Sequence, residues 1–200
     1  MRKSFILISA GVILFAACKS PEQKAEEKAA KNLVEGLSEM AKSTTKMESK
    51  VEDLKKLTPI SNEALKSFLP EELVGMRRSN FNVTSAMGFA AGEAEYAQDD
   101  TSEVRVSIHD CAGEAGSAFY SMQYFLRLNM EQENDNGYNK AIDFMDSRAV
   151  ETYDKSANEY SLVFLAADRF LISVAGDNVG LDKVKETAKA LDYDKLKGLK

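Results

Sequence analysis

A pair of strands near the C-terminus constrains the fold most, because it is the most hydrophobic part of the chain after residue 18. Residues 160–166 and 169–175 have the length and composition of two strands joined by a tight turn. Apolar side chains alternate onto both faces of the first strand, with Leu162 and Phe164 on one face and Val163 and Leu165 on the other. Strands of this kind lie in the middle of a sheet, where both faces are covered. The pair therefore predicts the centre of a sheet.

Further strands and helices surround this pair. Residues 103–110 alternate Val104, Val106 and Ile108 with polar residues, which is typical of a half-buried strand. The other segments predicted as strands are 76–83, 88–97, 137–144 and 148–153. Helices are predicted at 62–68 with Ser61 as the N-cap, at 117–130 and at 179–191.

The order of these elements is strands, helix, strands, helix. Clustered strands with tight turns favour an α+β fold with a mostly antiparallel sheet packed by helices. We expect the helices around Phe119 and Val184 to cover the same face of the sheet. In this layout the chain resembles the Mog1/PsbP-like domains. Residues 69 to about 195 also resemble a domain of bacterial envelope proteins that carries no activity to transfer, through Leu69-Pro70, Leu73, Gly75, Arg77, Tyr96, Val104, Val106, Ile108 and Asp110.

A long amphipathic helix is predicted before the domain, from Lys24 to Leu57. Apolar or small residues recur there at heptad spacing, at Ala30, Leu33, Leu37, Met40, Thr44, Met47, Val51 and Leu54. If straight, this helix would reach about 50 Å. We interpret it as a solvated tether or a helix lying along the domain. The open alternatives are a coiled coil between copies, capture by a partner, and docking on the second face of the sheet.

The N-terminus has the pattern of an export signal. Arg2 and Lys3 precede an apolar run at residues 5–17, which as a helix spans about 20 Å and is too short to cross the roughly 30 Å core of a bilayer comfortably. A permanent membrane anchor is the second interpretation. The run ends at Phe15-Ala16-Ala17-Cys18, which resembles the lipobox of bacterial lipoproteins, although Phe15 departs from the usual aliphatic residue.

This resemblance implies a lipidation site at Cys18 and cleavage just before it. Two or more acyl chains, palmitate among them, would give stable anchoring where one alone would be marginal. The resulting parts are a signal peptide at 1–17, a lipid-anchored linker and helical tether at 18–58, and an α+β domain at 59–200. Lys19 is not the aspartate associated with retention in the inner membrane, so an outer-membrane location in the cell envelope is favoured if two membranes are present.

Charge excludes one class of partner. The chain has 26 basic and 32 acidic residues, and removal of Arg2 and Lys3 lowers its net charge from −6 to −8. An acidic surface argues against nucleic acid and against a second, electrostatic contact with anionic lipid. The expected partners are the membrane, through Cys18, and an envelope protein or a second copy, through the helix at 24–57.

One group of adjacent residues is a candidate for catalysis or metal binding. His109, Asp110 and Cys111 are adjacent, and on a strand His109 and Cys111 would share a face. A thiolate–imidazole pair is nucleophilic, and the two side chains can also bind metal. Against this, a catalytic pair normally comes from distant segments with a third residue that orients the base, and zinc needs three or four ligands. With Cys18 lipidated, no internal disulfide is expected.

The remaining motifs are weaker. Asp99, Asp100 and Glu103 form one acidic loop, and residues 131–137 form another that lacks the alternation of a calcium loop. Residues 113–116 lack the lysine of a phosphate-binding turn. Tyr120, Tyr124 and Tyr138 are interpreted as core or rim residues. The sequence thus predicts no catalytic residue, cofactor or metal, and indicates a non-enzymatic, lipid-anchored binding protein; the alternative is a thiol-dependent enzyme using Cys111 and His109.

Overall fold

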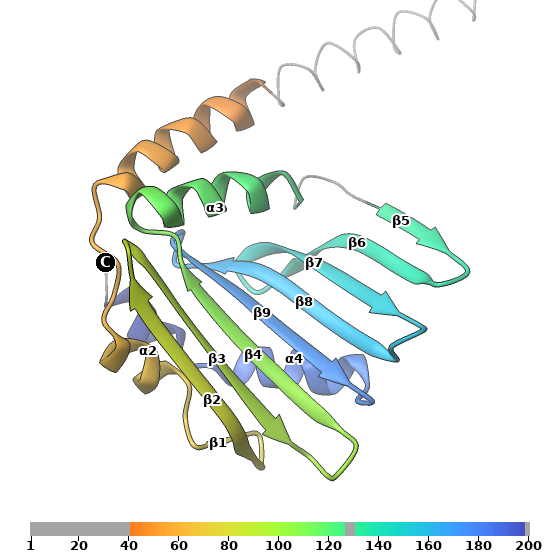
Figure 1. The fold of residues 1–200 in the computed structure, drawn as a ribbon. Helices are drawn as coiled ribbons and strands as arrows, with labels where there is room; N and C mark the ends of the chain where they lie inside the picture. The colour runs from red at the N-terminus through yellow and green to blue at the C-terminus, as the bar shows by residue number, and fades with distance from the viewer. Residues whose placement is uncertain (1–40, 127–130, 199–200) are drawn as a thin grey trace, which may run out of the picture. The chain divides into compact units, whose positions relative to one another are not determined.

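The computed structural model describes residues 41–126 and 131–198 (Figure 1). The chain divides into two units, Met1–Thr44 and Thr45–Lys200, and every strand described lies in the second. After a helix at residues 41–55, the elements are α2 (Asn62–Phe68), β1 (Glu72–Leu73), β2 (Met76–Ala86), β3 (Phe89–Ala97), β4 (Glu103–Asp110), α3 (Gly113–Leu126), β5 (Glu131–Asn134), β6 (Gly137–Phe144), β7 (Ser147–Asp154), β8 (Glu159–Ala166), β9 (Phe170–Asp177), α4 (Leu181–Ala190) and α5 (Tyr193–Lys197).

The strands form a single antiparallel sheet in the order β1-β2-β3-β4-β9-β8-β7-β6-β5. Two meanders, β1 to β4 and β5 to β9, meet where β4 pairs with β9, with Ile108 opposite Ile172. Every other neighbouring pair of strands is a hairpin between consecutive elements. The β4–β9 pair is therefore the one place where the sheet depends on contacts between distant parts of the sequence.

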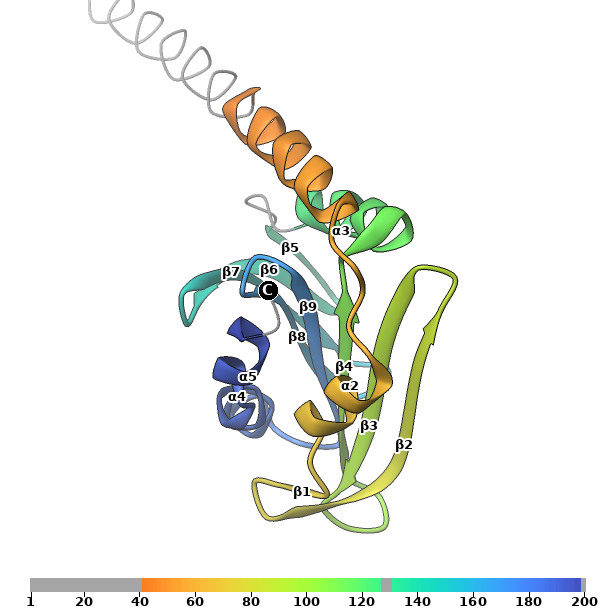
Figure 2. The same cartoon turned by 90° about the vertical axis from the view of Figure 1, so that its left-hand side faces the viewer.

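The first face of the sheet, which carries Val106, Ile108, Phe164 and Ile172, holds the larger core. These side chains pack with residues from α2, α4 and α5, among them Leu65, Phe68, Val184, Ala188 and Leu196. In Figure 2, α4 and α5 lie together on one side of the sheet. A Cβ on Gly176 would come within 2.3 Å of Val179 Cγ2 and 2.7 Å of Val184 Cγ2, so the glycine of β9 allows this close packing.

The second face, which carries Leu165 and Leu171, has a smaller core at one end. Met47 and Leu54 from the helix at 41–55 pack there with Cys111 and with Tyr120 of α3. Leu54 is fully buried. The stripe residues Met47, Val51 and Leu54 thus lie against the sheet, as in the docking alternative. No helix among the described residues is both long and apolar enough to span a bilayer.

The predicted fold class was wrong in its proportions. One nine-stranded antiparallel sheet dominates the described residues, and the helices among them are few and short. The described residues hold a helix at 41–55 instead of the long one predicted from Lys24 to Leu57, whose first part lies outside them. Phe119 and Val184 also belong to cores on opposite faces. A helical period identifies an apolar stripe but not the sheet face that it covers.

Several boundaries were predicted correctly. The predicted bounds of α2, β4 and β6 match the structure, and the Ser61 hydroxyl accepts a hydrogen bond from the Ala64 N–H, as predicted for an N-cap. β5 was missed, because all four of its residues are exposed and polar and show no apolar alternation. The short β1 and α5 were not predicted either.

We predict that truncating the central strands destabilises the domain strongly. Phe164→Ala and Ile172→Ala should each lower the free energy of unfolding by about 2–5 kcal/mol, since both side chains are almost fully buried and their loss leaves a cavity. Chemical denaturation measures this loss. Met87→Ala, at a fully exposed methionine, is the control and should cost less than about 0.5 kcal/mol. Losses that small at both core positions would contradict a central place for β8 and β9.

Candidate functional site

The sequence His109-Asp110-Cys111 ends β4, and the structure separates its side chains. Asp110 belongs to the first-face row of β4 and is fully buried. Cys111 is fully buried in the second-face core, and His109 is half-buried with its ring tilted against that of Phe119 on α3. The alternation of the strand thus gives His109 and Cys111 the shared side that the sequence predicted and sends Asp110 to the other.

Asp110 is bound by Arg169 from the β8–β9 turn. Arg169 Nε donates to Asp110 Oδ1 and Arg169 Nη2 donates to Oδ2, each at 2.8 Å. The backbone N–H groups of Ile60 and Ala112 donate to the same carboxylate at 2.8 and 3.0 Å. Arg169 Nη2 also donates to the Thr58 carbonyl oxygen at 2.8 Å. This bidentate, fully buried arrangement is a structural clamp, and the sequence analysis missed Arg169.

His109 and Cys111 are packed as core residues. The His109 ring lies between Phe89 and Phe119, with centroids at 5.9 and 5.0 Å. Burial lowers the pKa of His109, and the nearby Glu93 opposes this only in part. The Cys111 thiol lies 4.0 Å from the His109 carbonyl oxygen, a weak contact with the main chain. A nucleophilic thiol needs an accessible, electropositive environment, and this one is buried among apolar side chains.

The weaker motifs have structural explanations. Asp99 Oδ1 accepts hydrogen bonds from the N–H and hydroxyl of Thr101, which closes the first acidic loop. The second acidic loop is largely the strand β5. A Cβ on Gly116 would lie 2.6 Å from the Asp110 carbonyl oxygen, so the glycine permits close packing of α3 on the end of β4. No group of His, Cys, Asp and Glu that could hold a metal ion occurs among the described residues.

The tyrosines follow the core-or-rim prediction where they are described. Tyr120 is buried, and Tyr138 is half-buried. The Tyr124 side chain and Cys18 lie outside what the structure describes.

A second buried carboxylate was missed. Glu151, on the first face of β7, accepts a hydrogen bond from the Tyr138 hydroxyl at 2.8 Å and forms ion pairs with Lys185 and Lys140 at 2.7 and 3.1 Å. Burial alone would raise the pKa of Glu151, but these three donors outweigh burial and lower it. The only sign of this buried carboxylate in the sequence was a glutamate in the middle of a predicted strand. With all its donors supplied from within the domain, this cluster joins α4 to β6 and β7.

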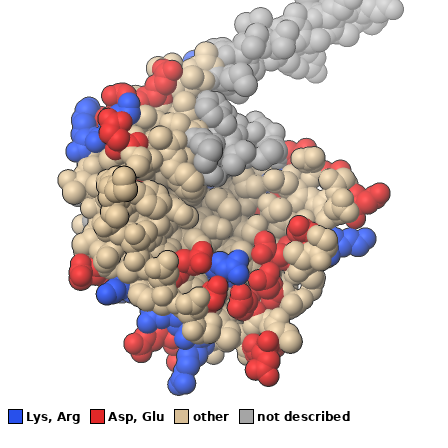
Figure 3. Space-filling view, in the orientation of Figure 1, with Lys and Arg blue, Asp and Glu red and all other residues tan. Residues whose placement is uncertain are grey.

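A charge network lies on the part of the second face that no described helix covers. Arg105 Nη2 lies 3.2 Å from a Glu103 carboxylate oxygen and 3.7 Å from one of Asp177, and Arg105 Nε lies 3.5 Å from Glu95. Burial, and then the charge of Asp177, raise the pKa of the adjacent Glu159. Figure 3 shows acidic side chains grouped with few basic ones on this face. The network keeps this part of the face polar.

A small pocket lies at the opposite end of β6 to β9 from this network. It has a volume of about 280 Å³ and is formed by the β6–β7 turn, the β8–β9 turn and α5. Its lining is mostly apolar or aromatic, with three charged residues: Phe144, Met145, Asp146, Ser147, Phe164, Leu165, Ala166, Ala167, Asp168, Tyr193 and Lys197. Small apolar pockets with a few polar groups are typical ligand sites.

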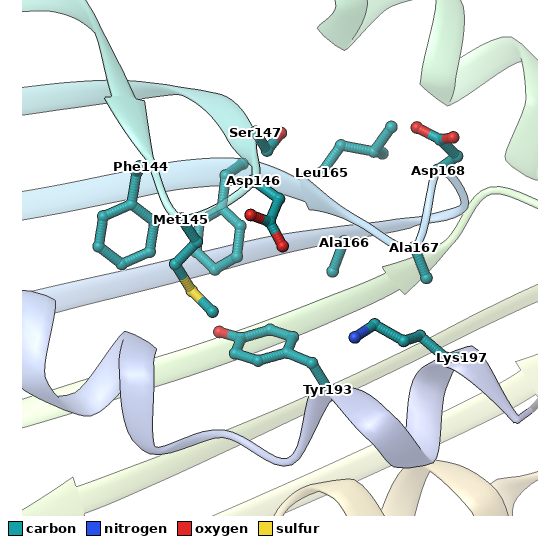
Figure 4. A pocket seen from close by; sticks show the side chains of 11 residues that line it. Phe144, Met145, Asp146, Ser147, Leu165, Ala166, Ala167, Asp168, Tyr193 and Lys197 are labelled. Atoms are coloured by element: carbon teal, nitrogen blue, oxygen red, sulfur yellow. The ribbon is translucent and has the colours of Figure 1, made fainter.

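The charged groups of the pocket are arranged unevenly. In Figure 4 the Asp146 carboxylate and the Lys197 amino group turn toward the space between the turns and α5, and the Asp168 carboxylate points away from it. Lys197 Nζ is also 3.1 Å from Asp194 Oδ1. The pocket therefore offers one negative and one positive group around an aromatic wall.

The backbone of both turns is unusual. Met145, Ala167 and Asp168 have φ values of 52°, 50° and 53°, in the left-handed region that non-glycine residues rarely adopt. The β6–β7 turn has two residues and the β8–β9 turn has three, residues 167–169, and such tight hairpin turns often use these angles because their twist matches that of the strands. The sequence predicted this turn at Ala167-Asp168, and in the structure it also includes Arg169. Its position beside Tyr193 and Lys197 depends on the tertiary fold.

Comparisons of the chain with protein-family models, with curated proteins and with solved structures found no match.

We predict that Asp110→Ala destabilises the domain by about 3–5 kcal/mol, because it leaves the Arg169 guanidinium buried without its carboxylate. Denaturant unfolding measures the loss. Arg148→Ala is the matched control: its 2.8 Å ion pair with Asp143 is exposed, so the change should cost less than about 1 kcal/mol. Equal, small losses for the two variants would show that the clamp is not structural.

Proposed function

We propose that this chain is a lipid-anchored protein of the bacterial cell envelope, not an enzyme, whose sheet domain binds a small ligand. The observation that carries the proposal is the N-terminal pattern, a short basic start, an apolar run and Phe15-Ala16-Ala17-Cys18. Cleavage before Cys18 and acylation of its sulfur and new amino group would hold the domain at a membrane. If the cell has two membranes, Lys19 favours the outer one.

The packing of the strand end supports a role other than thiol catalysis. Cys111 has no exposed surface, and Asp110 accepts four hydrogen bonds that bind it to the fold. The His109 ring is packed between two phenylalanines, and the buried thiol contacts the His109 carbonyl oxygen at 4.0 Å. The enzyme alternative would thus require the local core to open.

The pocket at the β6–β7 and β8–β9 turns supports ligand binding. Its aromatic wall suits an apolar group, and Asp146 and Lys197 suit a positive and a negative group. A short zwitterionic peptide with apolar side chains has this chemistry. The exposed positions of Asp146 and Lys197 favour weak, reversible binding.

We predict that Cys18 carries the lipid. In cells fed a clickable palmitate analogue, the wild-type chain should be labelled and shortened, and Cys18→Ser should be unlabelled and keep its full mass. Cys111→Ser is the control and should label like the wild type, since its side chain is buried. A wild-type chain with no lipid label and no mass change would refute the anchor.

We predict that Lys197 contributes to binding of a free peptide carboxylate. With the full chain in lipid nanodiscs, titration calorimetry should show saturable binding of Leu-Leu and weaker binding of Leu-Leu amide. Lys197→Ala should weaken Leu-Leu by roughly twofold to fivefold, as expected for loss of an exposed ion pair, and leave the amide unchanged.

Lys195→Ala is the matched control for this pocket. Lys195 lies on the same helix, α5, but does not line the pocket, so its loss should alter neither affinity. No saturable binding of any of these peptides, or equal effects at Lys195 and Lys197, would refute the proposed ligand class.

A further inference from the structure

The sheet has one long edge without a neighbour among the described residues. β2 runs from Met76 to Ala86, but β1 pairs only with Met76 and Arg77. From Ser79 onward no described strand lies beside the outer side of β2 (Figure 2). Such an edge presents backbone N–H and C=O groups to any strand that can approach it.

Hydrogen bonds identify which residues face outward. The Arg78 N–H donates to the Glu71 carbonyl oxygen at 2.9 Å, away from β3. The pairing of β2 with β3 shifts register between Arg78 and Asn80, so the outward set changes there from even to odd positions. In agreement, the Phe81 N–H donates to the Asn80 side chain at 2.8 Å. Phe81, Val83 and Ser85 therefore direct their backbone groups to the open edge.

Two usual protections of an edge strand, charge and proline, are absent from β2 beyond the bulge at Arg78 to Asn80. Lysine, proline and inward-pointing charges normally prevent edge strands from pairing with other chains. Between Ser79 and Gly92 the chain has no charged residue and no proline. Asn80, Asn82 and Thr84 are exposed on the second face, and Phe81 and Val83 are half-buried on the first.

We propose that β2 pairs antiparallel with β2 of a second copy, around a two-fold axis at Asn82. This register places Phe81 of each copy opposite Val83 of the other, an aromatic and a β-branched side chain that pack well across strands. Asn80 then lies opposite Thr84 of the other copy. Registers centred on Phe81 or Val83 instead place one apolar residue opposite a serine.

The placement of charge and the expected membrane anchoring both agree with a second copy of the chain as the partner of β2. In this register the Arg77-Arg78 pairs lie at opposite ends of the paired segment, so they do not repel each other. The contact is limited to one strand from each copy, so the dimer is weak in dilute solution. Two copies held in the same membrane would pair more readily because of their high effective concentration; this last step alone rests on the proposed anchor.

Disulfide trapping in isolated membranes tests the pairing with the full chain. The backbone N–H and C=O of Asn82 face β3, so the two copies of residue 82 would form a non-hydrogen-bonded pair. Their Cα atoms would lie about 4.5 Å apart, close enough for a disulfide between cysteines at this position. Under mild oxidation Asn82→Cys should give a dimer on non-reducing gels. Thr84→Cys is the matched control, because it is equally exposed on the same face but opposes Asn80, and most of the dimer should be lost.

A second set of variants tests the register. Asn80→Cys with Thr84→Cys in one chain should restore the dimer, and adding Asn82→Lys should remove most of it by placing like charges at the axis. Equal trapping of Asn82→Cys and Thr84→Cys, or no dimer in any variant, would overturn the proposal. The experiment repeated with Cys18→Ser in concentrated detergent solution separates pairing from anchoring, since pairing persists there if only the anchor is wrong.

Discussion

The buried ion pair between Asp110 and Arg169 lies where β4 meets β9, the one pairing of non-consecutive strands in the described sheet. Two buried charges stabilise a fold only where both are fully hydrogen-bonded, and here the carboxylate accepts four bonds. The partners stand 59 positions apart, at the end of β4 and in the β8–β9 turn. Arg169 also binds the Thr58 carbonyl, so the segment leading into α2 is joined to the same point. The salt bridge therefore fixes the end of the β4–β9 pairing and the entry of α2 at one buried point.

This clamp explains why the end of β4, with His109, Asp110 and Cys111, is poorly suited to catalysis or metal binding although its residue types suggest both. A carboxylate with its acceptor positions occupied cannot orient a base or bind a metal. Its two sequence neighbours fall on the other side of the strand, one in the second-face core and one between phenylalanines. The groups that are accessible to a ligand lie instead at turns and edges, where side chains are not buried in the core.

Local sequence patterns predicted most of the strands but not the long-range ion pairs between elements. The alternation in residues 103–110 and the cap at Ser61 depend on neighbours in sequence, so both were predicted correctly. Arg169 and Glu151 find their partners across the sheet, and no periodicity marks such pairs. The pocket has the same origin: its lining comes from two turns and α5. The covering of opposite faces by α3 and α4 also depends on connection geometry, which an apolar stripe does not encode.

An open antiparallel sheet has two edges, and the two edges of this sheet differ in length and charge. The β5 edge is a four-residue strand with glutamates at two positions, so it is both short and charged. The β2 edge is long and uncharged beyond Arg78, and one of its outward N–H groups is satisfied by a neighbouring asparagine. Short length and charge both discourage pairing with another chain. Since only β5 has them, the physical asymmetry of the sheet directs any strand addition to β2.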